Sequence, residues 1–356
     1  MDYQERLKLI KEVGEEIVGE EELIEKLKAG KELTAYDGFE PSGRIHIAQG
    51  LLRAINVNKL TKANVRFKFW VADWFALMNN KLEGNLEKIQ TVGKYFIEVW
   101  KACGMDMSKV EFLWASENMN QDYWLRVLKI GNLNTVTRIT RCAQIMGRSE
   151  SSALSASQIF YPCMQASDIF ELEVDIAQLG MDQRKVNVLA REVAPKLGHI
   201  KPIAVHHHML MALSQPPTAS EDLSAADAAV ARKMSKSNPN SAIFMTDTED
   251  EIKRKFKKAY CPEGETKDNP VLEYCKYIVF ELLDEPFTVN RPEKFGGDVS
   301  YNSYKELEKS FVDKELHPMD LKSATAKYIN QLIDPVRKHF EEDSKAKELL
   351  EKVNSF

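Results

Sequence analysis

Apolar residues recur along the chain at two periods, one typical of helices and the other of buried strands. Between residues 4 and 28, apolar positions follow one another at steps of three and four with charged residues between them, which predicts one amphipathic helix. A second helix is predicted at 83–103. Four short, largely apolar runs predict strands: 33–36, 65–72, 110–114 and 174–177. Because strands and helices alternate, the sequence predicts a doubly wound, Rossmann-like parallel α/β sheet.

The pattern changes twice further along the chain. The stretch at about 115–160 is rich in Ser, Asn and Thr and is predicted to be a helical insertion. Few apolar anchors occur between 214 and 230, which indicates a mobile loop at about 214–240. Beyond Asp247 the strand signals vanish, and the helix-like segments are 249–260, 270–283, 303–315 and 320–353. We therefore expect two domains, a catalytic domain at 1–246 and an all-α C-terminal domain at 247–356.

Composition narrows the class of protein. The 356 residues carry a net charge of −5, so any nucleic-acid contact must come from local basic patches. The five cysteines form no C-x-x-C pair, which argues against a disulfide framework or a zinc ribbon and favours free thiols in a reducing compartment. No apolar run approaches about 18 residues, and the acidic N-terminus resembles neither a signal nor a transit peptide. We therefore expect a cytoplasmic protein without a membrane span.

A glycine-rich turn follows the first predicted strand. Residues 37–43 read DGFEPSG, and a helix is expected to start near His46. Such a unit places the helix N-terminus at the carboxyl edge of the sheet, where free N–H groups and the helix dipole favour phosphate. His46 can add a donor to the same anion. The alternative is an ordinary turn with a solvent-facing histidine.

A second candidate for phosphate binding lies in the predicted loop. The run Lys233, Met234, Ser235, Lys236 and Ser237 puts two lysines and two hydroxyls within five residues. Lysine acts as a mobile point charge on phosphate, which suits a leaving group whose charge grows in the transition state. A solvated Lys/Ser loop is the alternative interpretation.

Polar residues on one face of a predicted helix form a third candidate. Tyr161, Gln165 and Asp168 stand at i, i+4 and i+7 among apolar neighbours. A buried polar stripe costs free energy unless it is paired, so it is either satisfied internally or holds a polar ligand. Asp182 and Gln183 follow the 174–177 strand candidate and add groups for ribose hydroxyls and for an amino acid, unless they are a plain helix N-cap.

The two phosphate-binding motifs together resemble the signatures of class I aminoacyl-tRNA synthetases. The first departs from the usual pattern, because Ala48 and Gln49 stand where that family usually has glycine and then histidine or asparagine. From TAYDGFEPSGRIHIAQG to ELHPMDLK, the chain is similar to tyrosyl-tRNA synthetases of the archaeal/eukaryotic type. The resemblance implies activation of L-tyrosine by ATP with Mg²⁺, transfer to tRNA(Tyr), no tightly bound protein metal, and a homodimer built on the insertion.

The resemblance also implies roles for individual residues. The phenolic hydroxyl of tyrosine is assigned to Tyr36 and Asp168, and its ammonium end to Tyr161, Gln165 and Gln183. Stabilisation of the developing pyrophosphate is assigned to His46, Lys233 and Lys236. Contacts with ATP are assigned to Gly38, Glu40, Gly43, His46, Gln49, Asp182, Met234, Ser235, Lys236 and Ser237. The tRNA is assigned to Phe295 and Asp320 at the first anticodon base and to Arg138 and Arg141 at the acceptor stem.

Other interpretations of some residues stay open. Phe295 and Asp320 can be an aromatic core residue and an N-cap aspartate, and the basic run 252–258 can be a solvated helix face instead of a track for RNA. The run 206–208 is three histidines and invites a metal site. Successive strand residues alternate between faces, so the three cannot converge on one ion, and we expect a structural or polar role, with one of them near ATP.

Three rival functions explain only parts of the pattern. A tryptophanyl-tRNA synthetase shares the architecture but has little reason to keep the Asp168 acceptor with Tyr36 for a phenol. A small-molecule nucleotidylyltransferase leaves the C-terminal helices and the Lys233 loop unexplained. A synthetase-like RNA-binding paralogue is expected to have lost the motif lysines or histidine, which this chain keeps.

Overall fold

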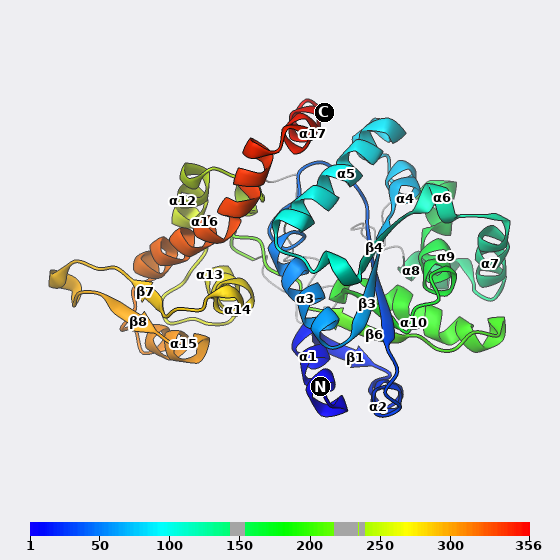
Figure 1. Ribbon diagram of the computed structural model, residues 1–356, viewed down its shortest axis with the longest axis horizontal. Helices are drawn as coiled ribbons and strands as arrows, with labels where there is room; N and C mark the ends of the chain where they lie inside the picture. The colour runs from blue at the N-terminus through cyan, green and yellow to red at the C-terminus, as the bar shows by residue number, and fades with distance from the viewer. Residues whose placement is uncertain (143–153, 217–233, 235–238) are drawn as a thin grey trace.

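A six-stranded sheet forms the centre of the N-terminal region in the computed structural model, which describes residues 1–142, 154–216, 234 and 239–356 (Figure 1). Its strands are β1 (Gly14–Val18), β2 (Leu33–Phe39), β3 (Val65–Val71), β4 (Val110–Trp114), β5 (Ile176–Gly180) and β6 (Ile203–His207), in the order β1-β6-β5-β2-β3-β4. The pairs are parallel except β1 with β6, which is antiparallel. The predicted doubly wound sheet is therefore confirmed, with two strands, β1 and β6, beyond the four predicted ones.

Helices cover both faces of this sheet (Figure 1). One face packs into a core with α1 (Tyr3–Val13), α2 (Glu20–Lys28), α3 (Leu51–Lys62) and α5 (Leu86–Ala102). The other face carries α4 (Asp73–Met78), α6 (Ala115–Asn118), α7 (Gln121–Asn132), α8 (Val136–Cys142), α9 (Ala156–Glu171) and α10 (Arg184–Val193). The described parts of the 115–160 segment are helical, as its composition suggested.

The prediction of one helix over 4–28 is wrong. The chain forms α1, then strand β1, then α2, and Gly19 between the last two has φ +92°, a left-handed conformation that favours glycine. Strand β1 pairs with β6 far along the chain, from Gly14 opposite His207 to Val18 opposite Ala204. A helical period in the local sequence does not reveal a strand that is stabilised by so distant a partner.

The prediction that a helix starts near His46 is also wrong. Strand β2 continues through Asp37 and Gly38 to Phe39, and α3 begins only at Leu51. The intervening backbone pairs with the segment that follows the second motif, because the Ile47 N–H donates to the Ile243 carbonyl oxygen at 2.8 Å. The first motif is thereby joined through the main chain to the segment that follows the second motif, far along the sequence.

The C-terminal region is helical, as predicted, but it also contains two strands that the sequence did not indicate. Its helices are α12 (Glu249–Lys258), α13 (Pro270–Tyr274), the π-helix η7 (Cys275–Val279), α14 (Phe280–Leu282), α15 (Tyr304–Val312), α16 (Pro318–Glu342) and α17 (Ser344–Asn354). The strands β7 (Phe287–Val289) and β8 (Val299–Tyr301) form an antiparallel pair. Three residues each are too few to show a period. Helix α17 returns to pack on α5 (Figure 1).

Two compositional expectations can be compared with the structure. All five cysteines are free, as predicted. Among the described helices, none combines the length and the apolar character needed to cross a membrane. The predicted loop at 214–240 lies largely outside the described residues.

Candidate active site

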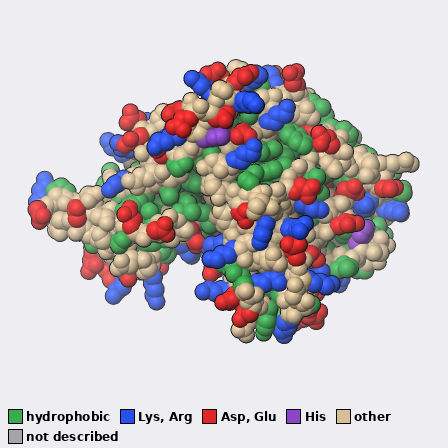
Figure 2. Space-filling model, viewed as in Figure 1, with side chains coloured by type: hydrophobic (Ala, Val, Ile, Leu, Met, Phe, Trp, Pro, Cys, Tyr) green, Lys and Arg blue, Asp and Glu red, His purple; other side chains and the backbone are tan. Residues whose placement is uncertain are grey.

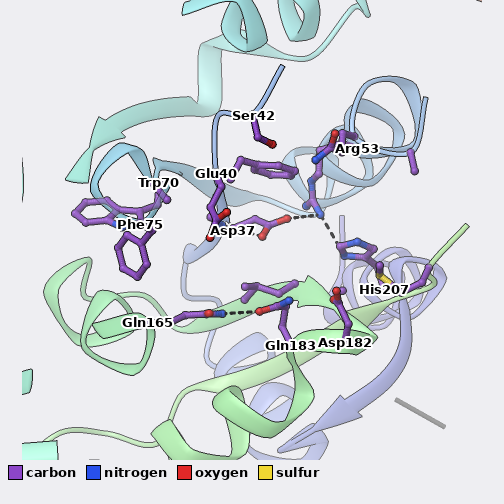
Figure 3. Close-up of a pocket in the computed structure, with 18 of the residues that line it drawn as sticks. Asp37, Glu40, Ser42, Arg53, Trp70, Phe75, Gln165, Asp182, Gln183 and His207 are labelled. Atoms are coloured by element: carbon purple, nitrogen blue, oxygen red, sulfur yellow. Dashed lines mark hydrogen bonds and ion pairs between the residues drawn. The ribbon is translucent and has the colours of Figure 1, made fainter. Parts of the chain in front are cut away.

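A cavity of about 490 Å³ opens at the carboxyl edge of β2, β3, β5 and β6, where open α/β sheets bind ligands (Figure 3). The predicted residues that line it are Tyr36, Gly38, Glu40, His46, Gln49, Tyr161, Gln165, Asp168, Asp182, Gln183 and Met234. Gly43 belongs to the turn at φ +81° and does not line the cavity. Lys233, Ser235, Lys236 and Ser237 lie outside the described residues.

One part of the cavity is a buried acceptor next to an unsatisfied hydroxyl. Asp168 on α9 is 2% exposed, and within the described residues the partner of its carboxylate is the Tyr123 hydroxyl, 2.7 Å from Oδ1. Burial raises the pKa of Asp168 well above its usual range. The fully buried Tyr36 hydroxyl has no hydrogen-bond partner in the described part of the chain. A ligand that offers both a donor and an acceptor, as a phenol does, satisfies this pair.

The rest of the polar stripe on α9 is paired across the cavity. The Tyr161 hydroxyl donates to Glu40 Oε1 at 2.5 Å, and Gln165 Nε2 donates to Gln183 Oε1 at 3.0 Å (Figure 3). Each pair joins α9 to a different strand end and still lines the cavity. Tyr161 and Gln165 are therefore both paired within the protein and presented to a ligand, so for these two residues the two interpretations do not exclude each other.

A buried arginine is among the residues that line the cavity. Arg53 on α3 is 1% exposed and reaches Asp37 Oδ2 at 3.1 Å, the Gln178 side chain, and His207 Nδ1 at 3.3 Å (Figure 3). Burial raises the pKa of Asp37 to about 7, against the opposing effect of Arg53. Burial, reinforced by the Arg53 charge, holds the pKa of His207 well below its usual range, so this imidazole is neutral near pH 7.

The three consecutive histidines have three different surroundings. Fully buried His206 lies 2.8 Å from Glu16 and 3.1 Å from Asn187, whereas His207 and His208 line the cavity. His208 lies 3.4 Å from Glu15 and 3.1 Å from Glu273. His206 and His208 are therefore engaged with polar and acidic side chains of the protein itself. In the described residues, no group of three or more His, Cys, Asp or Glu is arranged to hold a metal.

The two motifs meet at this cavity through residues that the structure describes. His46 lines it and forms a β-bridge with Phe244. Met234 is buried, lines the same cavity and lies 3.7 Å from the Tyr274 hydroxyl. The backbone N–H of Gln49 donates to the His46 carbonyl oxygen, so it is not available to phosphate as the predicted helix N-terminus required.

The residues assigned to tRNA lie away from the cavity. Phe295 is 60% exposed, which excludes the alternative of a core aromatic. Asp320 is in the first turn of α16, whose N-cap is His317, so it is not an N-cap aspartate. The Nη2 of Arg138 donates to both carboxylate oxygens of Glu192, at 2.9 and 3.1 Å, and Arg141 is exposed in the last turn of α8. In the basic run, Lys255 is buried against Asp247 and does not belong to a solvated face.

Several residues of the site were missed in the sequence. These are Asp37, Arg53, Trp70, Phe75 and Tyr123, of which all but Tyr123 line the cavity. Asp37 and Trp70 stand near the carboxyl ends of strands, and that position alone marks them as candidates. Arg53 interrupts an apolar stretch, which is a signal of a buried charge. Tyr123 gives no such signal.

Comparison with known proteins agrees with this geometry. The family model for class I tRNA synthetases (W and Y) matches residues 28–334. The chain is 51% identical to the cytoplasmic tyrosine–tRNA ligase 1 of Arabidopsis thaliana, over all of this chain and 89% of that protein. It is 42% identical to the tyrosine–tRNA ligase of Thermococcus kodakarensis, over 99% of both. The crystal structure of tyrosyl-tRNA synthetase from Pyrococcus horikoshii complexed with L-tyrosine superposes with a TM-score of 0.92, at 40% identity and over all of both chains.

The fold, the cavity and the family match together define the class: the chain belongs to the class I aminoacyl-tRNA synthetases, in the group for tryptophan and tyrosine. Within that group its family is that of the tyrosine–tRNA ligases, at 42–51% identity over essentially the full chain.

Proposed function

We propose that the chain is a tyrosine–tRNA ligase that activates L-tyrosine with ATP and transfers it to tRNA(Tyr). The observation that carries this proposal is that the buried Asp168 acceptor and the Tyr36 hydroxyl, which has no partner in the described residues, line the same cavity. A site built to hydrogen-bond a hydroxyl rejects the analogue that lacks it, and the tyrosine enzyme is itself the standard example of that rule.

The roles of the other residues are proposed from the resemblance to tyrosyl-tRNA synthetases. Tyr161, Gln165 and Gln183 hold the ammonium end of tyrosine. The residues assigned to ATP are Gly38, Glu40, Gly43, His46, Gln49, Asp182, Met234, Ser235, Lys236 and Ser237. Magnesium would accompany ATP as a bound counterion of its phosphates, which is its usual mode in nucleotide sites.

The chemistry requires no protein nucleophile. The tyrosine carboxylate attacks the α-phosphorus of ATP, the bond to the bridging oxygen breaks, and pyrophosphate leaves. The terminal ribose hydroxyl of tRNA then takes the tyrosyl group and AMP leaves. Positioning and electrostatic stabilisation supply the rate, with His46, Lys233 and Lys236 on the growing pyrophosphate charge.

A substitution in the second motif tests whether the motif acts on the transition state and not on tyrosine binding. Lys236→Ala is expected to lower the adenylation rate far more than it weakens tyrosine binding, because the lysine acts on charge that develops only in the transition state. Single-turnover kinetics give the rate, and equilibrium titration gives the binding constant. Equal losses in both would contradict the transition-state role.

The amino acid is tested by ATP–pyrophosphate exchange driven by tyrosine, tryptophan or phenylalanine in turn. Exchange with tyrosine is expected, and exchange with tryptophan alone would establish the main rival. Exchange with none of them would favour the RNA-binding paralogue or the nucleotidylyltransferase.

The C-terminal region, from residue 247 to 356, is assigned to the anticodon, and 1–246 to catalysis. Exposed Phe295 offers a face for base stacking, and Asp320 offers an acceptor for a base edge. Acidic and basic side chains are mixed on the face seen in Figure 2, so the contact with RNA depends on local groups, with Arg138 and Arg141 as acceptor-stem candidates. Phe295→Ala is expected to impair aminoacylation and to leave the exchange reaction intact; the reverse would sink the assignment.

We propose a homodimer from the exposed apolar side chains between residues 124 and 136. The exposed side chains are Trp124, Leu125, Leu128, Leu133 and Val136, with Leu128 at 59% and Val136 at 69% exposure. A cluster of large apolar side chains on one surface marks a protein interface. Sedimentation to the mass of a single chain would refute it.

A cytoplasmic location is proposed because the Arabidopsis relatives are named cytoplasmic.

A further inference from the structure

Tyr123 is a buried tyrosine of α7 that does not line the cavity but contacts its specificity residue. We infer that Tyr123 is a positioning residue for amino-acid selection, whose hydroxyl holds Asp168 in the orientation and the ionised form that accept a phenolic hydroxyl. The inference rests on the proposed function, because it assigns a task to a residue behind the tyrosine site.

The geometry fixes which oxygen of Asp168 faces the ligand. The Tyr123 hydroxyl lies 2.7 Å from Oδ1 of Asp168 and 2.9 Å from the Met164 carbonyl oxygen. Tyr123 is itself fixed at the start of α7, where its N–H donates to the N-cap Asn120 at 3.0 Å. Because the Tyr123 hydroxyl contacts Oδ1, Oδ2 is the oxygen left to accept a hydrogen bond from a substrate in the described structure.

The charges around Asp168 make this hydroxyl decisive. The groups that face the carboxylate are the hydroxyls of Tyr36 from β2 and Tyr123 from α7, and Tyr161 and Glu171 from α9 itself. Glu171 is a like charge, and the Arg126 of α7 is committed to it at 2.8 Å. Within the described residues Asp168 forms no ion pair, so O–H donors must stabilise its charge.

The direction of the effect on protonation follows from these contacts. Burial raises the pKa of Asp168, the donated Tyr123 proton lowers it, and Glu171 raises it. Without the Tyr123 hydroxyl the carboxyl takes up a proton at higher pH, and the substrate hydroxyl then loses its charge-assisted acceptor. Phenylalanine has no hydroxyl to lose, so its use does not depend on Tyr123 in this way.

The test is Tyr123→Phe, followed by ATP–pyrophosphate exchange with tyrosine and with phenylalanine from pH 6 to pH 9. We expect kcat/KM for tyrosine to fall about tenfold to 100-fold near pH 7, the value of one hydrogen bond to a charged group. The value for phenylalanine is expected to stay the same, and the acid limb of the tyrosine profile is expected to move to higher pH. In an Asp168→Asn background, Tyr123→Phe is expected to have little further effect.

Tyr301→Phe is a matched control. It removes a buried hydroxyl that lies 2.9 Å from Ser310 in the C-terminal region, away from the cavity, and it is expected to leave selectivity and the pH profile unchanged. If wild type uses tyrosine but Tyr123→Phe keeps both the tyrosine/phenylalanine ratio and the pH profile, the inference is wrong and the proposed function stands. If wild type does not exchange with tyrosine at all, the proposed function itself has failed.

Discussion

Two buried aspartates, Asp247 and Asp168, have opposite surroundings. Asp247 is fully buried and receives Lys255 at 2.5 Å, Arg44 at 3.0 Å and the Phe244 N–H at 2.9 Å. Asp168 is almost equally buried, but in the described residues its carboxylate receives one tyrosine hydroxyl. The first is neutralised and joins the segment after the second motif to the first motif. The second keeps an unused acceptor at the cavity.

The difference shows how to separate structural from functional charges in this molecule. A buried carboxylate with complete partners is explained by the fold, whereas one that is left with unused acceptor capacity indicates a missing ligand. Burial alone does not distinguish the two. This distinction is tested by substitutions at Asp247's partner and at Asp168, with stability and activity measured separately.

The largest effect is expected from Lys255→Met. It leaves the Asp247 charge buried with only part of its compensation, and the loss of one partner of a buried pair costs about 3–5 kcal/mol. Urea denaturation followed by circular dichroism measures the loss of unfolding free energy. Lys253→Met is the control, because Lys253 is exposed and its pair with Glu249 lies in solvent. Equal, small effects of both substitutions would show that the Asp247 cluster does not stabilise the fold.

The second effect is on activity, in Asp168→Asn. The amide keeps the shape but removes the charge that accepts the phenol, so exchange with tyrosine is expected to fall roughly 100-fold, about 3 kcal/mol. The unfolding free energy is expected to stay the same or to rise, because a desolvated charge is removed. A loss of stability as large as that of Lys255→Met would place Asp168 in the structural class.

The smallest expected effect is a pH dependence of the unfolding free energy. It arises at His208, which lies between the carboxylates of Glu15 and Glu273. Burial disfavours the charged imidazole, but hydrogen bonds to both carboxylates outweigh it and raise the pKa of His208 to about 9. A folded pKa above the unfolded value of about 6.5 means that the stabilisation is complete below pH 6.5 and is lost as pH rises through 9. The shift corresponds to about 3 kcal/mol. Because the Glu15 side chain is 50% exposed, solvent screening lowers the expected loss over that window to the order of 2 kcal/mol.

Denaturation at pH 6.5 and pH 9.5 checks this expectation. His208→Gln cannot change charge, so its unfolding free energy should vary less between the two pH values. If the variant and wild type show the same pH dependence, other groups are responsible.

Much of the fold was predictable, because strands such as β3 and β4 are short, largely apolar runs. The polar lining of the cavity was predictable where it sits on a helix period, as Tyr161, Gln165 and Asp168 do. Contacts between residues far apart in the sequence could not be predicted. Examples are the pairing of β1 with β6 and the β-bridge between His46 and Phe244. Tyr123 was missed for the same reason, since only the packing of α7 on α9 brings its hydroxyl to Asp168.

The antiparallel pairing of β1 with β6 has a consequence for synthesis on the ribosome. Gly14 pairs with His207, so the first strand to emerge must wait for the last strand of its sheet. At about 5–20 residues per second that delay is on the order of 10–40 seconds. Throughout it β1 lacks its native partner strand, and its unpaired backbone groups are an edge to which another chain can pair.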